Sequence, residues 1–327
     1  MLKRIVAVIL VLTVAVSLAS CTYTEYYIPG SDSSNNLKDS PVKDFDYEIV
    51  EDYVKITKYK GDQTEVRIPR IIEGLYVCVI GEDAFESRAS LKSVHIPDEV
   101  QVIEKGAFKR CYYMEKVTGG KGIVSIAEQA FIYNAKLKEF PWEEKLQIIG
   151  DSAFMWCESL ERVDIVSSCD YIGNYAFRDC KKVAEINFAD EVVSIGAEAF
   201  MATNITKLHY PYATNIIGDG AFKHNNSLVE ITFDERVTEL APRAFQNSHA
   251  LKDVVIPSHI RLIKEYAFGS YFEIETMTWE NPYVEFEDHP LLQVTDYTVY
   301  GYAGSTAEFY VQTCPANRNI KFEAITE

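Results

Sequence analysis

The sequence predicts an α/β repeat solenoid, a right-handed coil of about nine 23-residue units with short parallel strands and a cap at each end. Three observations lead to this fold. The stretch IGEDAF at residues 80–85 occurs nine times in all when its looser copies are counted. The Phe that ends each copy returns at a near-constant interval. Apolar and polar residues alternate ahead of the copies, which is the pattern of a half-buried strand.

The period of the repeat is clearest at this Phe. Its successive intervals are 23, 23, 23, 23, 23, 22, 23 and 23 residues. A fixed period in the twenties is typical of a leucine-rich-repeat solenoid, in which each unit depends on its neighbours to bury its apolar side. The interval of 22 follows Phe200, and we expect this deletion to fall in a turn without shifting the strands. The nine positions are Phe85, Phe108, Phe131, Phe154, Phe177, Phe200, Phe222, Phe245 and Phe268.

One unit, residues 91–108, reads LKSVHIPDEVQVIEKGAF. Val94 and Ile96 alternate with polar residues and predict a strand with one buried face. Pro97 ends this strand because proline cannot donate a hydrogen bond to a neighbouring strand. We expect Phe108 to fill the middle of the coil.

The first residues predict export. A positive pair, Lys3 and Arg4, precedes an apolar run of 14 residues, which is shorter than the roughly 20 residues of a membrane-spanning helix. The run ends in LASC, which resembles the bacterial lipobox and implies that Cys21 is lipidated. An ordinary secretion signal with a chance cysteine is the alternative. Two acyl chains on one residue suffice for stable anchoring.

The chain is predicted to divide into five segments. Residues 1–20 form a lipoprotein signal peptide, and residues 21–44 form a polar tether without apolar periodicity. Residues 45–79 form an N-terminal cap hairpin, residues 80–281 form the solenoid, and residues 282–327 form a C-terminal cap. In the last segment, STAE at 305–308 is a capping-box motif that predicts a short helix.

The unit pattern L..V.IP..V..I...AF resembles the BspA-like, or Treponema-type, leucine-rich repeat of bacterial surface proteins. The resemblance extends over about residues 45–327 and includes both caps. It implies a cell-surface protein, held to the membrane by its lipid, that acts as a non-catalytic binding or adhesion module for a protein or surface polymer. Because this scaffold serves many partners, the resemblance names none of them.

Composition narrows the classes of partner. The 327 residues carry a formal net charge of −17, whereas nucleic-acid binding requires clustered Lys and Arg. The same charge opposes electrostatic adhesion to anionic lipid. We therefore expect no nucleic-acid partner and contact with the membrane through the lipid alone.

No motif indicates catalysis, a cofactor or a metal. The chain contains no HExxH, P-loop or GxSxG sequence. His95 and His209 occupy equivalent strand positions five coils apart, about 24 Å at strand spacing, which is too far to share a metal. The alternative function is an envelope component with a solute-binding or enzymatic accessory role. A stack of coils offers no closing cleft for a solute.

The cysteines follow the repeat. Three of the seven lie three residues after the repeat Phe, in a slot that elsewhere holds small polar residues. We interpret it as a slot for a side chain that bonds to backbone under the turn. Whether Cys157 and Cys180 in adjacent coils are oxidised stays open. The slot holds Cys111, Asn134, Cys157, Cys180, Thr203, Asn225 and Ser248.

One outward strand slot alternates in charge along successive units. Opposite charges on neighbouring strands attract by roughly 0.2–1 kcal/mol per pair. The row can simply neutralise itself, or it can match a mixed-charge protein partner. Lys116 and Arg162 are the candidate binding residues under the second interpretation. The row is Lys116, Glu139, Arg162, Glu185, Lys207 and Glu230.

Aromatic and apolar residues gather just after the repeat Phe in the second, third and fourth units. An exposed aromatic cluster is typical of a contact surface, whereas ordinary packing against the neighbouring turn is the alternative. The candidate binding residues are Tyr112, Tyr113, Ile132, Tyr133, Met155 and Trp156.

Overall fold

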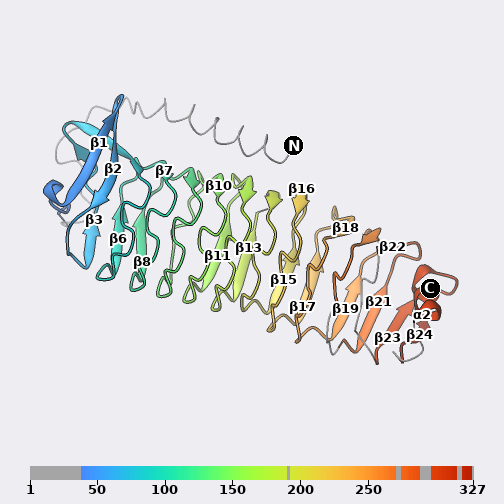
Figure 1. Cartoon of the computed structure of the whole chain (residues 1–327). Helices are drawn as coiled ribbons and strands as arrows, with labels where there is room; N and C mark the ends of the chain where they lie inside the picture. The colour runs from blue at the N-terminus through green and yellow to red at the C-terminus, as the bar shows by residue number, and fades with distance from the viewer. Residues whose placement is uncertain (1–37, 190–191, 270–273, 288–295, 315–318, 326–327) are drawn as a thin grey trace.

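The computed structural model describes residues 38–189, 192–269, 274–287, 296–314 and 319–325. These residues form one β-solenoid of about 11 turns, with the N-terminal hairpin at one end and the C-terminal strand at the other (Figure 1). The predicted repeat solenoid with parallel strands is confirmed. The predicted signal peptide, the lipidated Cys21 and most of the tether lie outside the described residues.

Most coils contribute a strand to a first face. Neighbouring strands are parallel and in register at the repeat spacing, so that Val94 on β6 pairs with Val117 on β8. The strands are β3 (Glu65–Arg67), β6 (Ser93–Ile96), β8 (Lys116–Gly119), β11 (Arg162–Ile165), β13 (Glu185–Phe188), β15 (Lys207–Tyr210), β17 (Glu230–Phe233), β19 (Asp253–Ile256), β21 (Thr276–Trp279), β23 (Thr298–Gly301) and β24 (Lys321–Ala324).

A second, shorter strand in most coils builds a second face. Ile126 on β9 pairs with Ile149 on β10, and both side chains are buried. The strands are β5 (Leu75–Ile80), β7 (Val102–Ile103), β9 (Ser125–Ile126), β10 (Ile148–Ile149), β12 (Tyr171–Ile172), β14 (Val192–Ile195), β16 (Ala213–Ile217), β18 (Glu239–Leu240), β20 (Leu262–Ile263) and β22 (Glu285–Phe286).

The third side consists of turns that still bond from coil to coil. The Phe108 N–H donates to the Ala130 carbonyl at 2.8 Å, and the Phe131 N–H donates to the Ala153 carbonyl at 2.7 Å. Residues two before and two after the repeat Phe have positive φ in most coils. Two left-handed residues per coil therefore turn the chain around its Phe.

The caps use different structures. At the N-terminal end, the short 3₁₀ helix η2 (Val42–Asp44) precedes the antiparallel hairpin of β1 (Phe45–Val50) and β2 (Tyr53–Tyr59), and β2 pairs with β5. β4 (Ile71–Ile72) forms a second antiparallel pair with β5.

At the C-terminal end lies α2 (Thr306–Thr313), the one α-helix of the described residues. The Ser305 hydroxyl accepts a bond from the Glu308 N–H, as the capping-box motif predicts. Within the described residues, the α-helical part of the predicted α/β solenoid is thus limited to the C-terminal cap.

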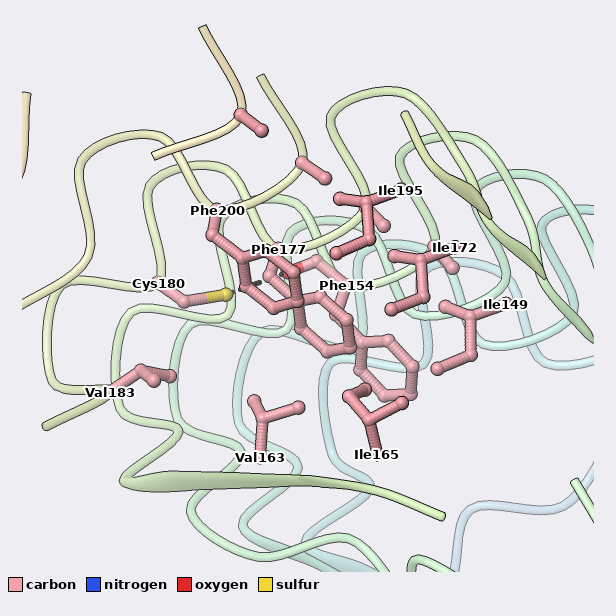
Figure 2. Packing of buried hydrophobic residues seen from close by; sticks show 14 of the residues in the cluster. Ile149, Phe154, Val163, Ile165, Ile172, Phe177, Cys180, Val183, Ile195 and Phe200 are labelled. Carbon is pink, nitrogen blue, oxygen red and sulfur yellow. Dashed lines mark hydrogen bonds between the residues drawn. The ribbon is translucent and has the colours of Figure 1, made fainter. Parts of the chain in front are cut away.

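The core is a column of Phe rings. The rings of Phe131 and Phe154 stack with centroids 5.1 Å apart and planes 6° apart, and those of Phe154 and Phe177 stack at 5.3 Å and 5°. Figure 2 shows Phe154, Phe177 and Phe200 one behind another, beside Ile149 and its equivalents in the next coils. All nine repeat Phe side chains are buried.

The Gly of the IG motif has a steric reason. A Cβ on Gly150 would lie 2.6 Å from the Glu128 nitrogen, and a Cβ on Gly173 would lie 2.4 Å from the Asp151 nitrogen. Gly196 and Gly218 meet the preceding coil in the same way. These glycines allow the coils to approach at strand spacing.

Among the described residues the first-face ladder is interrupted at three places, between β8 and β11, between β13 and β15, and between β17 and β19. Pro141 follows Glu139 at an outward strand position, and this coil keeps only one bridge to β8, between Lys116 and Glu139, while β11 begins a separate sheet. Phe140 and Trp142 instead pack on the ring of Phe154, at 5.0 and 5.3 Å.

The second interruption lies at the 22-residue interval. β13 and β15 belong to separate sheets, and the pairing of β14 with β16 shifts register between Val192 and Ser194. Beyond this local irregularity Ile195 pairs with Ile217 at the 22-residue interval, and β15 keeps the alternation of exposed and buried residues seen on β11. The deletion therefore leaves the buried face of the strands unchanged, as expected.

Phe154→Ala should lower the free energy of unfolding by about 3–5 kcal/mol, because it removes a buried ring that touches four other aromatic rings. Urea unfolding followed by circular dichroism measures the loss. Tyr113→Ala, at an exposed position, is the matched control and should change stability by less than about 0.5 kcal/mol. Equal losses in the two variants would contradict the assigned core.

Candidate partner-binding surface

The predicted binding residues lie on two different sides of the coil. Lys116 begins β8 and Arg162 begins β11, so both project from the first strand face. The aromatic candidates lie on the turn side, after the repeat Phe. The sequence therefore predicted two separate candidate binding surfaces.

The charged row on the first face is internally paired. Lys116 Nζ lies 3.8 Å from the Glu139 carboxylate, and Lys207 Nζ lies 2.5 Å from that of Glu230. Arg162 contacts Asp164 on its own strand at 2.7 Å. The row thus neutralises itself, and its exposed pairs contribute little stability each.

On the turn side, two aromatic rings stack across adjacent coils. Tyr133 and Trp156 have ring centroids 6.4 Å apart and planes 17° apart. Lys181 Nζ lies 4.9 Å from the centroid of the Trp156 ring, in a cation–π contact, and 2.7 Å from the Glu158 carboxylate. The structure therefore joins Tyr133, Trp156 and Lys181 in one stack that runs along the solenoid.

Solvent exposure separates the aromatic candidates. Tyr112 is 45% exposed, Tyr113 is 58% exposed and Tyr133 is 37% exposed. Trp156 and Met155 are half-buried. Ile132 is 6% exposed and therefore does not belong to the exposed surface.

Two of these aromatics have an unusual backbone. Tyr133 has φ 64° and Trp156 has φ 63°, in the slot where Asp179 and Asn247 also have positive φ. Asp and Asn tolerate this conformation, whereas a bulky residue pays about 1–2 kcal/mol for it. A strained backbone conformation persists where packing or function maintains it. The stack with Lys181 is one such contact.

Sequence reasoning missed Lys181 and Tyr175. Lys181 lies two slots beyond Trp156 in the next coil, so a comparison of equivalent slots does not bring them together. Tyr175 is exposed, and the Arg178 guanidinium lies 5.5 Å from its ring centroid. The available signal for Lys181 was a cation four residues after Phe177, the repeat Phe of the next coil.

Most members of the cysteine slot bond to backbone as predicted, whereas the buried side chains of Asn134 and Ser248 have no hydrogen-bond partner within the described part of the chain. The thiols of Cys111, Cys157 and Cys180 donate to the carbonyls of the Phe one coil back, at 3.1, 3.3 and 3.2 Å. Asn225 in the same slot donates to the Phe200 and Phe222 carbonyls. Both Cys157 and Cys180 are reduced, and Figure 2 shows the bond of Cys180.

These thiols are poor nucleophiles. Burial raises the pKa of Cys111 and of Cys169 to about 12, and burial raises the pKa of Cys157 above its usual range. A nucleophilic or metal-binding cysteine needs the opposite shift. The described residues contain no group of three or more His, Cys, Asp and Glu side chains placed to hold a metal.

A cavity of about 220 Å³ lies at the second-face break between β16 and β18. Tyr210, Tyr212 and Arg236 line it, with the guanidinium 4.8 Å from the Tyr212 ring centroid. The guanidinium also bonds both oxygens of Asp234 and holds the pKa of that carboxyl at about 2. The Tyr210 hydroxyl accepts the Ala241 N–H at 3.3 Å and replaces a ladder carbonyl.

The described helices offer no membrane crossing, since none has the necessary length and apolar character.

Comparison with known proteins yields a family and several similar structures. The model of the protein family described as "BspA type Leucine rich repeat region (6 copies)" matches residues 78–202 and 193–293 of this chain. A leucine-rich-repeat protein from T. pallidum is 27% identical, with a TM-score of 0.50, over 65% of this chain and 91% of that chain. A leucine-rich cell surface protein from Faecalibacterium prausnitzii is 20% identical, with a TM-score of 0.49, over 88% of this chain and 96% of that chain. No curated protein matches.

At about pH 8, just below the ordinary pKa of a thiol, Cys111, Cys157, Cys169 and Cys180 should resist alkylation in the folded protein, because burial keeps them protonated and inaccessible. Cys314 is partly exposed and should react first. Mass spectrometry of peptides after iodoacetamide treatment, with and without denaturant, measures both. Rapid native labelling of Cys157 would contradict the assigned slot.

Proposed function

We propose that this chain, which belongs to the BspA-type leucine-rich-repeat family, is a non-catalytic surface module that binds a protein or a surface polymer. One observation carries the proposal. Exposed aromatic side chains are grouped on the turn side of a solenoid whose own packing does not require their exposure. Aromatic residues dominate the binding energy of protein interfaces.

The shape of the solenoid suits such a role. About 11 coils at a strand spacing of about 4.8 Å give a stack on the order of 50 Å long. A standard protein interface needs about 800 Å² on each partner, and one side of this stack is large enough to supply it. Because each coil is held by its neighbours, the surface is preorganised before binding.

The aromatic surface is the better candidate for the energetic centre. Tyr112 and Tyr113 contribute the most exposed rings, and Tyr133 is fixed by its stack on Trp156. A fixed ring loses little conformational entropy on binding. The paired charges around Lys116 would influence orientation more than affinity, since their mutual contacts already satisfy them.

Anchoring at the cell surface is the second part of the proposal. It rests on LASC at the end of an apolar run of signal length, with Cys21 as the lipidated residue and residues 21–44 as the tether. The similar protein from Faecalibacterium prausnitzii is described as a cell surface protein. A tethered solenoid would hold its binding side away from the lipid headgroups.

A solute-binding or enzymatic accessory role has less support. The cavity beside Tyr212 holds about 220 Å³, below the usual size of a small-molecule site. Its arginine is already bonded to Asp234. A substrate turned over by the purified chain would contradict the binding-module proposal.

Cys21→Ala should abolish lipid attachment and release the chain from the membrane fraction, because the thiol is the proposed acceptor of the lipid. Metabolic labelling with a fatty-acid probe, followed by membrane fractionation, measures both effects. Cys314→Ala is the matched control and should label like the parent chain. Continued labelling of the Cys21→Ala variant would contradict the anchor.

Tyr133→Ala combined with Trp156→Ala should weaken partner binding at least tenfold, the effect of losing about 1.4 kcal/mol or more at a hot spot. The assay is a pull-down from host and bacterial surface extracts, followed by affinity measurement on the protein recovered. Tyr283→Ala removes the most exposed aromatic side chain far along the chain and serves as the control.

A different outcome of this binding assay would assign the partner-binding site to the first strand face. If binding survives the aromatic double change but is lost when Lys116 and Arg162 are reversed to Glu, the first strand face is the contact surface. Circular dichroism of each variant confirms that the solenoid is intact.

A further inference from the structure

The last strand of the first face has an open edge. β24 ends the sheet β19-β21-β23-β24, and within the described residues no strand pairs with its other side. β24 lies at the C-terminal end of the stack, next to α2 (Figure 1). An open strand edge presents unpaired N–H and C=O groups and is a template for another strand.

The backbone direction along β24 is defined by its bonds to β23. The Lys321 N–H donates to the Tyr297 carbonyl at 3.1 Å, and the Ile325 N–H donates to the Gly301 carbonyl at 2.8 Å. In a parallel pair, alternate residues bond to the same neighbour. The N–H and C=O groups of Phe322 and Ala324 therefore point away from β23, toward the open edge.

The charges on this strand are unusual for the first face. Elsewhere on this face, Lys252 and Glu275 pair across neighbouring strands at 2.5 Å, as do Lys207 and Glu230. Lys321 and Glu323 instead lie opposite the neutral Thr298 and Tyr300. Both charged side chains are exposed, and neither has an ion-pair partner among the described residues.

We propose that β24 is a homodimer interface, on which the β24 strand of a second copy of this chain pairs antiparallel about a twofold axis at Phe322. This register places Phe322 opposite its own copy as a hydrogen-bonded pair, using the groups that point to the open edge. Lys321 then lies directly opposite Glu323 of the other copy, and Glu323 lies opposite Lys321. The strand is complementary to itself.

The two registers nearest to this one are unfavourable. An axis at Glu323 would require backbone groups that already bond to β23, and it would place like charges opposite each other. A shift of one residue would also turn the side chains to the wrong face. Lys321 and Glu323 occupy non-hydrogen-bonded positions in the proposed pair, where opposing side chains approach most closely. The symmetric contact closes after two copies, as an isologous interface does.

The test is a charge-reversal cycle on the full chain in detergent, followed by sedimentation equilibrium over a concentration series. Lys321→Glu alone, and Glu323→Lys alone, should each weaken dimerisation at least about tenfold, because each turns two attractions into two repulsions. The double variant Lys321→Glu, Glu323→Lys should restore the parent dimer. Lys138→Glu changes the same charge elsewhere on this face and should leave the dimer intact.

A backbone variant provides an independent measurement. Ala324→Pro removes an N–H that points to the open edge while leaving the bonds to β23. It should give a monomer with an unchanged circular dichroism spectrum. A parent chain that sediments as a monomer would overturn the proposal, as would a dimer that persists in every variant or a double variant that stays monomeric.

Discussion

Stacking at strand spacing is the constraint on which the rest of the structure depends. The rings of Phe131, Phe154 and Phe177 follow one another at 5.1 and 5.3 Å, close to the distance between neighbouring strands. One ring per coil fills the axis only if every coil returns to the same point. The period, the inward isoleucines and the glycines of the IG motif all serve this return, because a Cβ on Gly173 would meet the preceding coil.

Because every coil returns to the same point, equivalent residues of successive units line up in a row along the solenoid. A row can satisfy itself, as the thiols of Cys111, Cys157 and Cys180 do by bonding to the Phe carbonyls. The charged row on the first face does so with ion pairs. Residues without such a partner in the neighbouring coil are the better candidates for contact with another molecule. Tyr112 and Tyr113 remain exposed and stack on no other ring of the described residues, and Lys321 with Glu323 ends its row against neutral neighbours.

Where the return fails, the fold changes locally. The short interval after Phe200 coincides with separate sheets for β13 and β15, and the Phe222 and Phe245 rings are 6.3 Å apart, the widest step of the column. The cavity beside Tyr212 lies in the same region. The turn-side bonds continue through it, with the Phe222 N–H donating to the Ala244 carbonyl. The coil therefore passes this region on one continuous ladder while the two strand faces are interrupted.

The sequence by itself determined the solenoid, its period, the buried Phe and the thiol slot. Equivalent positions of successive units have the same surroundings, so the role of one position predicts the role of its equivalents in the other units. The sequence also placed Tyr133 beside Trp156, since equivalent slots in adjacent coils must be neighbours. Only the tertiary structure decided that Ile132 is buried, that Lys181 covers the Trp156 ring and that the first-face strands fall into separate sheets. These outcomes depend on side-chain direction and on contacts between non-equivalent slots. A one-dimensional alignment of repeats does not contain either of them.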